Sequence, residues 1–415
     1  MTVLSSRRSF MTLAAGLGVG VSFLGRQAFA ASDGDLARRK MVVVICRGGM
    51  DGLSVSPPVG DAAYAELRGP VALRPDQPLK LDGTFGLHPG LPSVHRLIMK
   101  GQARIAPAIA SPDRARSHFE AQDVLETGAA QVYGAQTGWL NRALEALAPA
   151  RKVEGLSVGT TAPLILRGKV QAASWSPGRG IDETARLPTL LQDLYRNDPL
   201  LGPAFARGLE TETMAQAAMT AMAPSAAETE MAAVAPPETA RNGQGQQARE
   251  ATRKLGATLA GFMNQADGPQ IAALSLDGFD THAGQPGQIA TRLSYLDAVL
   301  DGLNMGLGAS WKDTVVLVVT EFGRTARVNG TNGTDHGTGS TALVLGGALK
   351  PGGIIGDWPG LSAAALYENR DLRPSLDMRG LFKGVLADHM GVDTTLLESK
   401  IFPGSADVPA IRGLV

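Results

Sequence analysis

Short apolar runs alternate with amphipathic stretches along most of the chain. The run at 41–46 (MVVVIC) is continuous, rich in β-branched residues and too short for a helix, which predicts a strand buried on both faces. Similar runs predict further buried strands at 103–110, 155–158, 163–166, 270–276, 314–320 and 341–345. Between the strands, helical periodicity predicts helices around 117–127, 137–147, 187–196, 247–265, 287–305 and 377–390.

This alternation predicts an α/β fold, with a single elaborated domain, a mostly parallel central sheet and helices on both faces. Ligands of such sheets bind beyond the carboxyl ends of the strands. We therefore expect functional side chains in the loops that follow positions 46, 110, 276, 320 and 345.

The first thirty residues are typical of an export signal. Arg7 and Arg8 precede the apolar run 13–24, and Ala28-Phe29-Ala30 is a small-x-small cleavage pattern. The paired arginines predict export by the twin-arginine machinery, and the alternative is an ordinary secretory signal that carries two arginines. Either signal places the mature protein, which would begin near residue 31, in the periplasm or outside the cell.

A second stretch, at 215–248, also departs from the alternation. It is dominated by Ala, Met, Glu, Pro and Gln, a composition that does not bury a varied core. We expect a frayed helix and a linker that form an exposed insertion in the domain 31–415. A partner-binding helix is the alternative, but the stretch lacks aromatic residues and a sustained heptad.

Composition excludes several classes of protein. With 44% hydrophobic and 19% charged residues, the chain of 415 residues is not typical of a disordered protein. The 39 basic and 39 acidic residues balance and are not concentrated, so a nucleic-acid partner is not favoured. No apolar run beyond the signal is long enough for a membrane span. Cys46 is the only cysteine, so the exported fold depends on its core or on a bound metal.

Candidate chemistry begins in the loop 47–53 (RGGMDGL), which follows the first predicted strand. Its glycines allow a sharp turn that would present Asp51 at the edge of the sheet, where the carboxylate suits a hard cation. The alternative is structural, because Asp-Gly is a common turn pair whose carboxylate bonds its own backbone.

The segment 111–123 (SPDRARSHFEAQD) places Ser117 where a helix begins. With Glu120 three residues on, Ser117 fits a capping box. A hydroxyl at a helix N-terminus, with Arg114 and Arg116 beside it, could alternatively attack or hold a phosphate or sulfate group.

Two further loops carry metal-ligand chemistry. Asp280 and His282 follow the predicted strand 270–276, and a carboxylate–imidazole pair suits Zn²⁺, Mn²⁺ or Fe, whereas Ca²⁺ and Mg²⁺ prefer oxygen alone. The loop after 314–320 carries Glu321 and Arg324, then a glycine-rich stretch with Asp335-His336. There His336 could be a metal ligand with Asp335 as its orienting or ligating carboxylate, and Arg324 could clamp an anionic substrate. The alternatives are a hydrogen-bonding histidine at His282 and a turn-rich loop with incidental charges.

The sequence resembles a family of exported bacterial proteins of unknown function that is grouped with the alkaline phosphatase and sulfatase superfamily. The resemblance lies in the export signal, the segments 47–53 and 111–123, and the loops 276–285 (LDGFDTHAGQ) and 320–339 (TEFGRTARVNGTNGTDHGTG). The resemblance runs from about 41 to 390. It implies one α/β domain and a site with one or two divalent metals, together with a nucleophile at a helix N-terminus.

By this resemblance, Asp51 would be the first metal-binding acid, Ser117 the nucleophile, and Asp280 and His282 ligands of one metal. The Asp-His pair of the superfamily reads Glu321-Phe322 here, and a phenylalanine cannot bind a metal. His336 would be the later histidine of the pattern, unless Asp335-His336 stands for the pair. In both alignments one histidine is missing, so a single metal or a site without hydrolytic activity is implied. Cys46 is followed by Arg47-Gly48, so the formylglycine motif of sulfatases is absent.

The sequence therefore predicts an exported hydrolase-like protein that depends on a divalent metal, with Zn, Mn, Fe or Ca as candidates. Its substrate would be a small-molecule or glycan ester of phosphate or sulfate. Ser117 would attack, the metal would lie on Asp51, Asp280 and His282 with Glu321, and Arg324 or Arg116 would hold the free oxygens. The alternative is a cell-envelope protein without catalysis that uses the same fold to bind a partner or a glycan.

Overall fold

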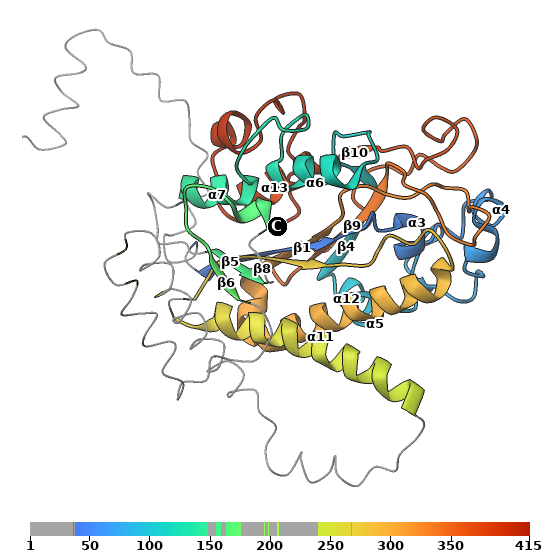
Figure 1. Cartoon of the computed structure of the whole chain (residues 1–415), viewed down its shortest axis with the longest axis horizontal. Coiled ribbons are helices and arrows are strands. Elements are labelled where there is room, and N and C mark those ends of the chain that lie inside the picture. The colour runs from blue at the N-terminus through green and yellow to red at the C-terminus, as the bar shows by residue number, and fades with distance from the viewer. Residues whose placement is uncertain are drawn as a thin grey trace, which may run out of the picture.

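The structure is a computed structural model, shown in Figure 1. It describes residues 38–147, 155–158, 163–175, 240–266 and 268–415, together with Leu36, Tyr195, Asp198 and Ala206. The predicted signal and the predicted helix at 187–196 lie outside these ranges, apart from Tyr195. Of the predicted insertion, 215–239 lies outside them, whereas 240–248 is part of a long helix rather than a linker.

An eight-stranded sheet forms the centre of the molecule, in the order β10-β4-β9-β8-β1-β7-β5-β6. All of its neighbouring strands pair in parallel except β9, which is antiparallel to both β4 and β8. The sheet is thus mostly parallel, as predicted. The strands are β1 (Lys40–Cys46), β4 (Ala103–Ala110), β5 (Gly155–Val158), β6 (Ala173–Trp175), β7 (Ile271–Leu276), β8 (Thr314–Val319), β9 (Ser340–Leu345) and β10 (Leu376–Asp377), and a separate hairpin pairs β2 (Leu79–Lys80) with β3 (Gly86–Leu87).

One predicted strand, at 163–166, is wrong: Leu164–Leu166 forms a 3₁₀ turn. Its backbone groups find side-chain partners instead of a strand. The carboxylate of Glu126 accepts from the main-chain N–H of Ile165 at 2.9 Å, and the amide of Asn141 donates to the carbonyl of Leu166 at 2.8 Å. Because these partners satisfy the buried polar groups, the apolar side chains can be buried without a place in the sheet.

The direction of β9 corrects a second expectation. We expected functional residues after position 345, at the end of this strand. Since β9 runs against its neighbours, its end lies at the opposite edge of the sheet, where Gly346 donates to the carbonyl of Gln102 just before β4. The start of β9, at Ser340, therefore lies beside the carboxyl ends of β4 and β8.

Helices cover both faces of the sheet (Figure 1). Helices α5, α11 and α12 pack on one face, and α6, α7 and α13 pack on the other. Among the described residues, the helices of eight or more residues are α5 (Pro92–Met99), α6 (His118–Thr127), α7 (Trp139–Leu147), α11 (Ala240–Asn264), α12 (Gln285–Leu307) and α13 (Met378–Asp388), and the shorter ones are α3 (Gly52–Val55), α4 (Tyr64–Arg68) and α14 (Thr394–Leu396). No helix among the described residues is both long and apolar enough to cross a membrane.

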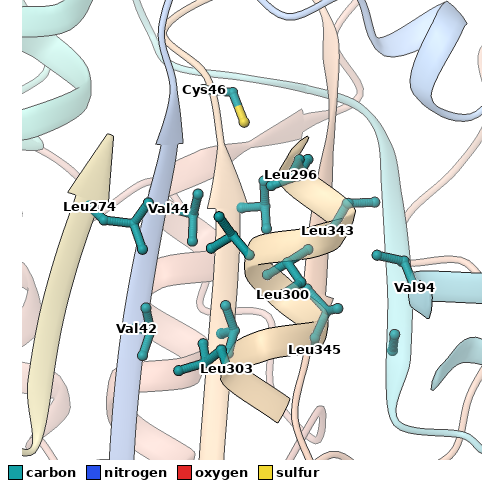
Figure 2. Packing of buried hydrophobic residues seen from close by; sticks show 14 of the residues in the cluster. Val42, Val44, Cys46, Val94, Leu274, Leu296, Leu300, Leu303, Leu343 and Leu345 are labelled. Carbon is teal, nitrogen blue, oxygen red and sulfur yellow. The ribbon is translucent and has the colours of Figure 1, made fainter. Parts of the chain in front are cut away.

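Alternate residues of the central strands supply the two cores. Val42 and Val44 of β1 point to the α12 side, where they meet Leu296, Leu300 and Leu303 (Figure 2). Met41, Val43 and Ile45 point to the other side, against α7 and α13. Because β1 is buried on both faces, it consists of apolar residues without the polar alternation of a half-exposed strand.

Candidate metal centre

Loops that adjoin four strands meet at one end of the sheet, beyond the carboxyl ends of the parallel strands. The carboxyl ends of the parallel strands β4, β7 and β8 lie there together with the start of the antiparallel β9. The loops at these ends bring together His118 after β4, Asp280 and His282 after β7, Glu321 and Arg324 after β8, and Asp335 and His336 before β9. Residues that are distant in sequence thus form one polar cluster.

Three imidazole rings turn the same nitrogen toward Asp280. The Nε2 atoms of His282 and His336 lie 3.0 and 3.1 Å from Oδ1 of Asp280, and Nε2 of His118 lies 3.4 Å from Oδ2. The Nε2 atoms of His282 and His336 are also 3.0 Å apart. Four side chains therefore direct electron-pair donors at one small volume.

The other ring nitrogen of each histidine has an acceptor. Nδ1 of His118 lies 2.9 Å from Oε1 of Glu321, Nδ1 of His282 lies 3.2 Å from Oδ1 of Asp335, and Nδ1 of His336 lies 2.9 Å from the main-chain oxygen of Arg116. An acceptor at Nδ1 favours the tautomer with its proton there, which leaves the lone pair of Nε2 free for a cation.

Fixed charges keep the carboxylate ionised. Burial alone would raise the pKa of Asp280, but the hydrogen bond and the positive charge of Arg324 lower it overall, and Nη1 of Arg324 lies 2.6 Å from Oδ1. The hydrogen bond to Glu321 raises the pKa of His118, whereas burial lowers the pKa of His336. Arg324 itself is buried, and it also donates to the carbonyls of Thr334 and Gly48.

The glycines after β1 hold Glu321 in place. Gly48 and Gly49 both have positive φ, at 112° and 69°, and their N–H groups donate to Oε1 of Glu321 at 2.8 and 3.2 Å. Successive N–H groups in such a turn form a nest for an anion. Burial would raise the pKa of Glu321, but the hydrogen bonds from His118 and this nest lower it. Glu321 therefore orients His118 from behind.

These donors fit a transition metal. His118, Asp280 and His336 offer ligand atoms that all lie within 4.8 Å of one another, and His282 adds a third imidazole beside them. Imidazole nitrogens with one carboxylate are the ligands of Zn²⁺, Mn²⁺ and Fe, whereas Ca²⁺ takes oxygen ligands. The chemistry of the donors thus favours the first three ions over calcium.

Asp51 lies in a different environment from this cluster. Its Oδ2 is paired with the guanidinium of Arg68 and accepts hydrogen bonds from Ser54 at 2.6 Å and Gln285 at 2.5 Å. Asp51 and Arg68 are both buried, and a fixed guanidinium already neutralises the carboxylate. The glycines of the loop after β1 thus contact the candidate metal centre through Glu321, whereas Oδ2 of Asp51 is bonded to Arg68, Ser54 and Gln285.

The predicted nucleophile and the second arginine lie beside the cluster. Ser117 is the N-cap of α6, directly before His118, and its hydroxyl makes no capping hydrogen bond, so the predicted capping box does not form. Arg116 pairs through its side chain with Asp371 at 2.8 Å and with Glu368. Its guanidinium is thereby directed toward these two acids.

His118 was missed by the sequence reasoning, which favoured His282 and His336. The available signal was its position in the loop after 103–110, one residue past Ser117. Phe322, which stands where a ligand was expected, packs its ring against His118 and His336, with ring centroids 4.9 and 4.8 Å apart. This residue therefore forms an apolar wall of the centre.

The sequence matches a known protein family. Residues 88–401, which are more than half of the chain, match the protein family of unknown function DUF1501. The chain belongs to this family. The DUF1501 match includes every residue of the cluster that surrounds Asp280 and confirms the expected family of unknown function. No curated protein sequence matches the chain.

Several solved structures match this DUF1501 chain at low sequence identity. The C-terminal periplasmic domain of EcEptC from Escherichia coli, in complex with Zn, is 8% identical, with 74% of this chain and 72% of that chain covered and a TM-score of 0.34. Ps i-CgsB is 10% identical, with 88% and 74% covered and a TM-score of 0.38. A mutant of TAB5 alkaline phosphatase with bound Mg is 11% identical, with 74% and 90% covered and a TM-score of 0.34.

Proposed function

We propose that the protein is an exported, metal-dependent hydrolase of phosphate or sulfate esters. The observation that supports this most directly is the convergence of three Nε2 atoms on Asp280, with each Nδ1 atom held by its own acceptor. Histidines oriented in this way are typical of metal sites, because the acceptor fixes both the tautomer and the ring. His118, Asp280, His282 and His336 would hold the ion.

In this proposal each group has a separate task. A divalent metal would supply positive charge for the non-bridging oxygens of the ester as their negative charge grows. Ser117, at the N-terminus of α6, attacks phosphorus or sulfur while the bond to the leaving alcohol breaks, and the hydroxyl proton of Ser117 ends on the oxygen of that alcohol. Water then releases the phosphate or sulfate and restores the hydroxyl. Arg324 holds Asp280 ionised and in position, so it acts on the centre rather than on the substrate.

The first experiment is elemental analysis of mature protein purified from the periplasm. We expect about one equivalent of zinc, manganese or iron, and a strong loss of metal in Asp280→Asn and His282→Ala. His95→Ala is the matched control, because the ring of His95 bonds the carbonyl of Lys80 outside the cluster. A folded protein without metal, or with equal metal in all variants, would contradict the proposal.

Activity is tested separately with phosphate monoesters, phosphate diesters and sulfate esters. Wild-type protein with its metal should hydrolyse at least one class, and Ser117→Ala should lower kcat by a factor of about 10³ or more, since a nucleophile is removed. Ser111→Ala, in the same loop but bonded to the main chain of Glu321, serves as the control. Hydrolysis at the wild-type rate by Ser117→Ala would contradict the role of Ser117.

A second candidate function is binding without catalysis. One observation favours it: Arg116 and Arg324, the two cations expected to hold a substrate anion, are engaged with Asp371 and Asp280. Such a protein would bind a partner or a glycan in the cell envelope. Metal-loaded protein that hydrolyses none of the three ester classes would favour this function.

A further inference from the structure

A buried carboxylate, that of Asp371, lies behind the metal centre. Its side chain is fully buried and carries two ion pairs, from Oδ2 to Nε of Arg116 at 2.8 Å and from Oδ1 to Nη1 of Arg370 at 2.9 Å. Both arginines in turn bond to His336. The main-chain oxygen of Arg116 lies 2.9 Å from Nδ1 of His336, and Nη2 of Arg370 donates to the main-chain oxygen of His336 at 2.8 Å. Asp371 is thus linked to both the ring and the backbone of this candidate ligand.

The backbone of Arg116 points to the same role. Its φ is 59°, in the left-handed region that is unfavourable for a residue with a side chain. In this conformation its carbonyl oxygen faces the imidazole of His336. Strained conformations persist where the surroundings hold them, and here Asp371 and Glu368 hold the guanidinium of the same residue.

The position of Asp371 is itself fixed by main-chain bonds. Its N–H donates to the carbonyl of Tyr367 at 3.0 Å, and its carbonyl accepts from the N–H of Tyr367 at 2.9 Å, which closes a tight turn. Glu368 and Asn369 inside the turn have φ of 52° and 51°. A backbone bridge also joins Asp371 to Thr325, in the loop after β8. The carboxylate is therefore a fixed point for the two arginines.

We propose that Asp371 is a positioning residue of the metal centre. Through Arg116 and Arg370 it holds His336 with its Nε2 atom toward Asp280, although it contacts neither the metal nor the substrate. This inference rests on the metal centre of the proposed function. It differs from the tasks of Glu321 and Asp335, which bond directly to the rings of His118 and His282.

The test is zinc affinity, measured by competition with a chromogenic chelator, in Asp371→Asn. This change keeps the size of the side chain and removes its charge. We expect the affinity to fall by about 10- to 100-fold, the usual effect of losing an orienting group behind a metal ligand. The visible spectrum of the cobalt-substituted protein should also change, because a displaced imidazole alters the coordination geometry. Asp301→Asn is the matched control: Asp301 also pairs with two arginines, Arg96 and Arg253, but it lies on α12 outside the cluster, so the zinc affinity of this variant should match wild type.

Each outcome decides the inference. Folded Asp371→Asn with wild-type zinc affinity and a wild-type cobalt spectrum would overturn it. Should Asp371→Asn not fold, Arg370→Gln breaks one link at a partly exposed side chain and is expected to weaken zinc binding several-fold, and unchanged binding there would overturn the inference. Wild-type protein that binds no metal would instead overturn the proposed function.

Discussion

The hydrogen-bond partners of each imidazole ring decide whether His118 and the neighbouring histidines can bind a metal. The same imidazole is a metal ligand, an acid or a structural donor according to the partner of its second nitrogen. His118, His282 and His336 each have an acceptor at Nδ1 and share Asp280 at Nε2. His88 has a different setting: it is buried, its Nδ1 accepts from the N–H of Gly90, and no carboxylate in the described part of the chain bonds it.

Gly49→Ala should destabilise the protein by roughly 2–4 kcal/mol, because an alanine would be strained at φ 69° and its Cβ would lie 2.3 Å from the ring of Phe322. The measurement is the free energy of unfolding in urea. Gly330→Ala, where a Cβ would meet no atom within 4 Å, is the control. Equal stability of the two variants would contradict tight packing of Gly49 against Phe322 beside the candidate metal centre.

His88 should make stability depend on pH. Burial lowers its pKa from 6.5 to about 4, so between these values the unfolded chain binds a proton that the folded protein excludes. Stability therefore falls as pH falls through this window, by about 3 kcal/mol in total, and above pH 6.5 the effect is absent. In His88→Asn, whose amide oxygen can still accept from Gly90, the free energy of unfolding should decrease less between pH 7 and pH 4 than in wild type. The same slope as wild type would contradict this, and His95→Asn is the control.

At the scale of elements, the continuity of an apolar run decided what could be predicted. Strands β1, β7 and β8 are unbroken runs of mainly apolar residues, and the sequence located them to within a residue or two at each end. β6 and β10 have three and two residues and carry no such pattern, so they were not predicted. The error at 163–166 arose because side chains of α6 and α7 bond the backbone there, and such long-range partners leave no local trace in a sequence.

The packing of α12 against the sheet gives a prediction at this scale. Leu300 is buried between the helix and the strands (Figure 2). Leu300→Ala should therefore destabilise the protein by about 2–5 kcal/mol, through lost apolar burial and the cavity left behind. Met305→Ala, on the exposed side of the same helix, should change stability by less than about 0.5 kcal/mol. Chemical denaturation of both variants checks the difference, and similar values would mean that α12 is not anchored by this face.

At the scale of the whole molecule, the site depends on which strand ends share an edge. The sequence located the loops that carry Asp280, His282, Glu321 and His336, because each adjoins a recognisable strand. It did not fix the direction of β9, which is set by pairing with β4 and β8. Nor could it show that Asp51 lies beside Arg68, since that ion pair is created by the path of the chain between them.

A metal that binds this shared edge should stabilise the whole fold. At a free zinc concentration of 100 times Kd, the free energy of unfolding should rise by about 2.7 kcal/mol. Thermal unfolding with and without zinc measures this, and Asp280→Asn should show a much smaller rise. Magnesium, which prefers ligands that are all oxygen, is the matched ion and should have little effect. Equal stabilisation by both ions would contradict a metal site whose ligands are mainly histidines.

The positions of the ligands in the chain also determine when during folding the metal can bind. They come from α6, from the loop after β7 and from the loop before β9, so they meet only when strands far apart in the chain have paired. Such pairings are slow steps in folding, because long loops must close first. We therefore expect the metal to bind at the end of folding rather than at its beginning. For a chain exported from the cytoplasm by the twin-arginine pathway, as its first residues predict, a bound metal would distinguish folded molecules from unfolded ones before export.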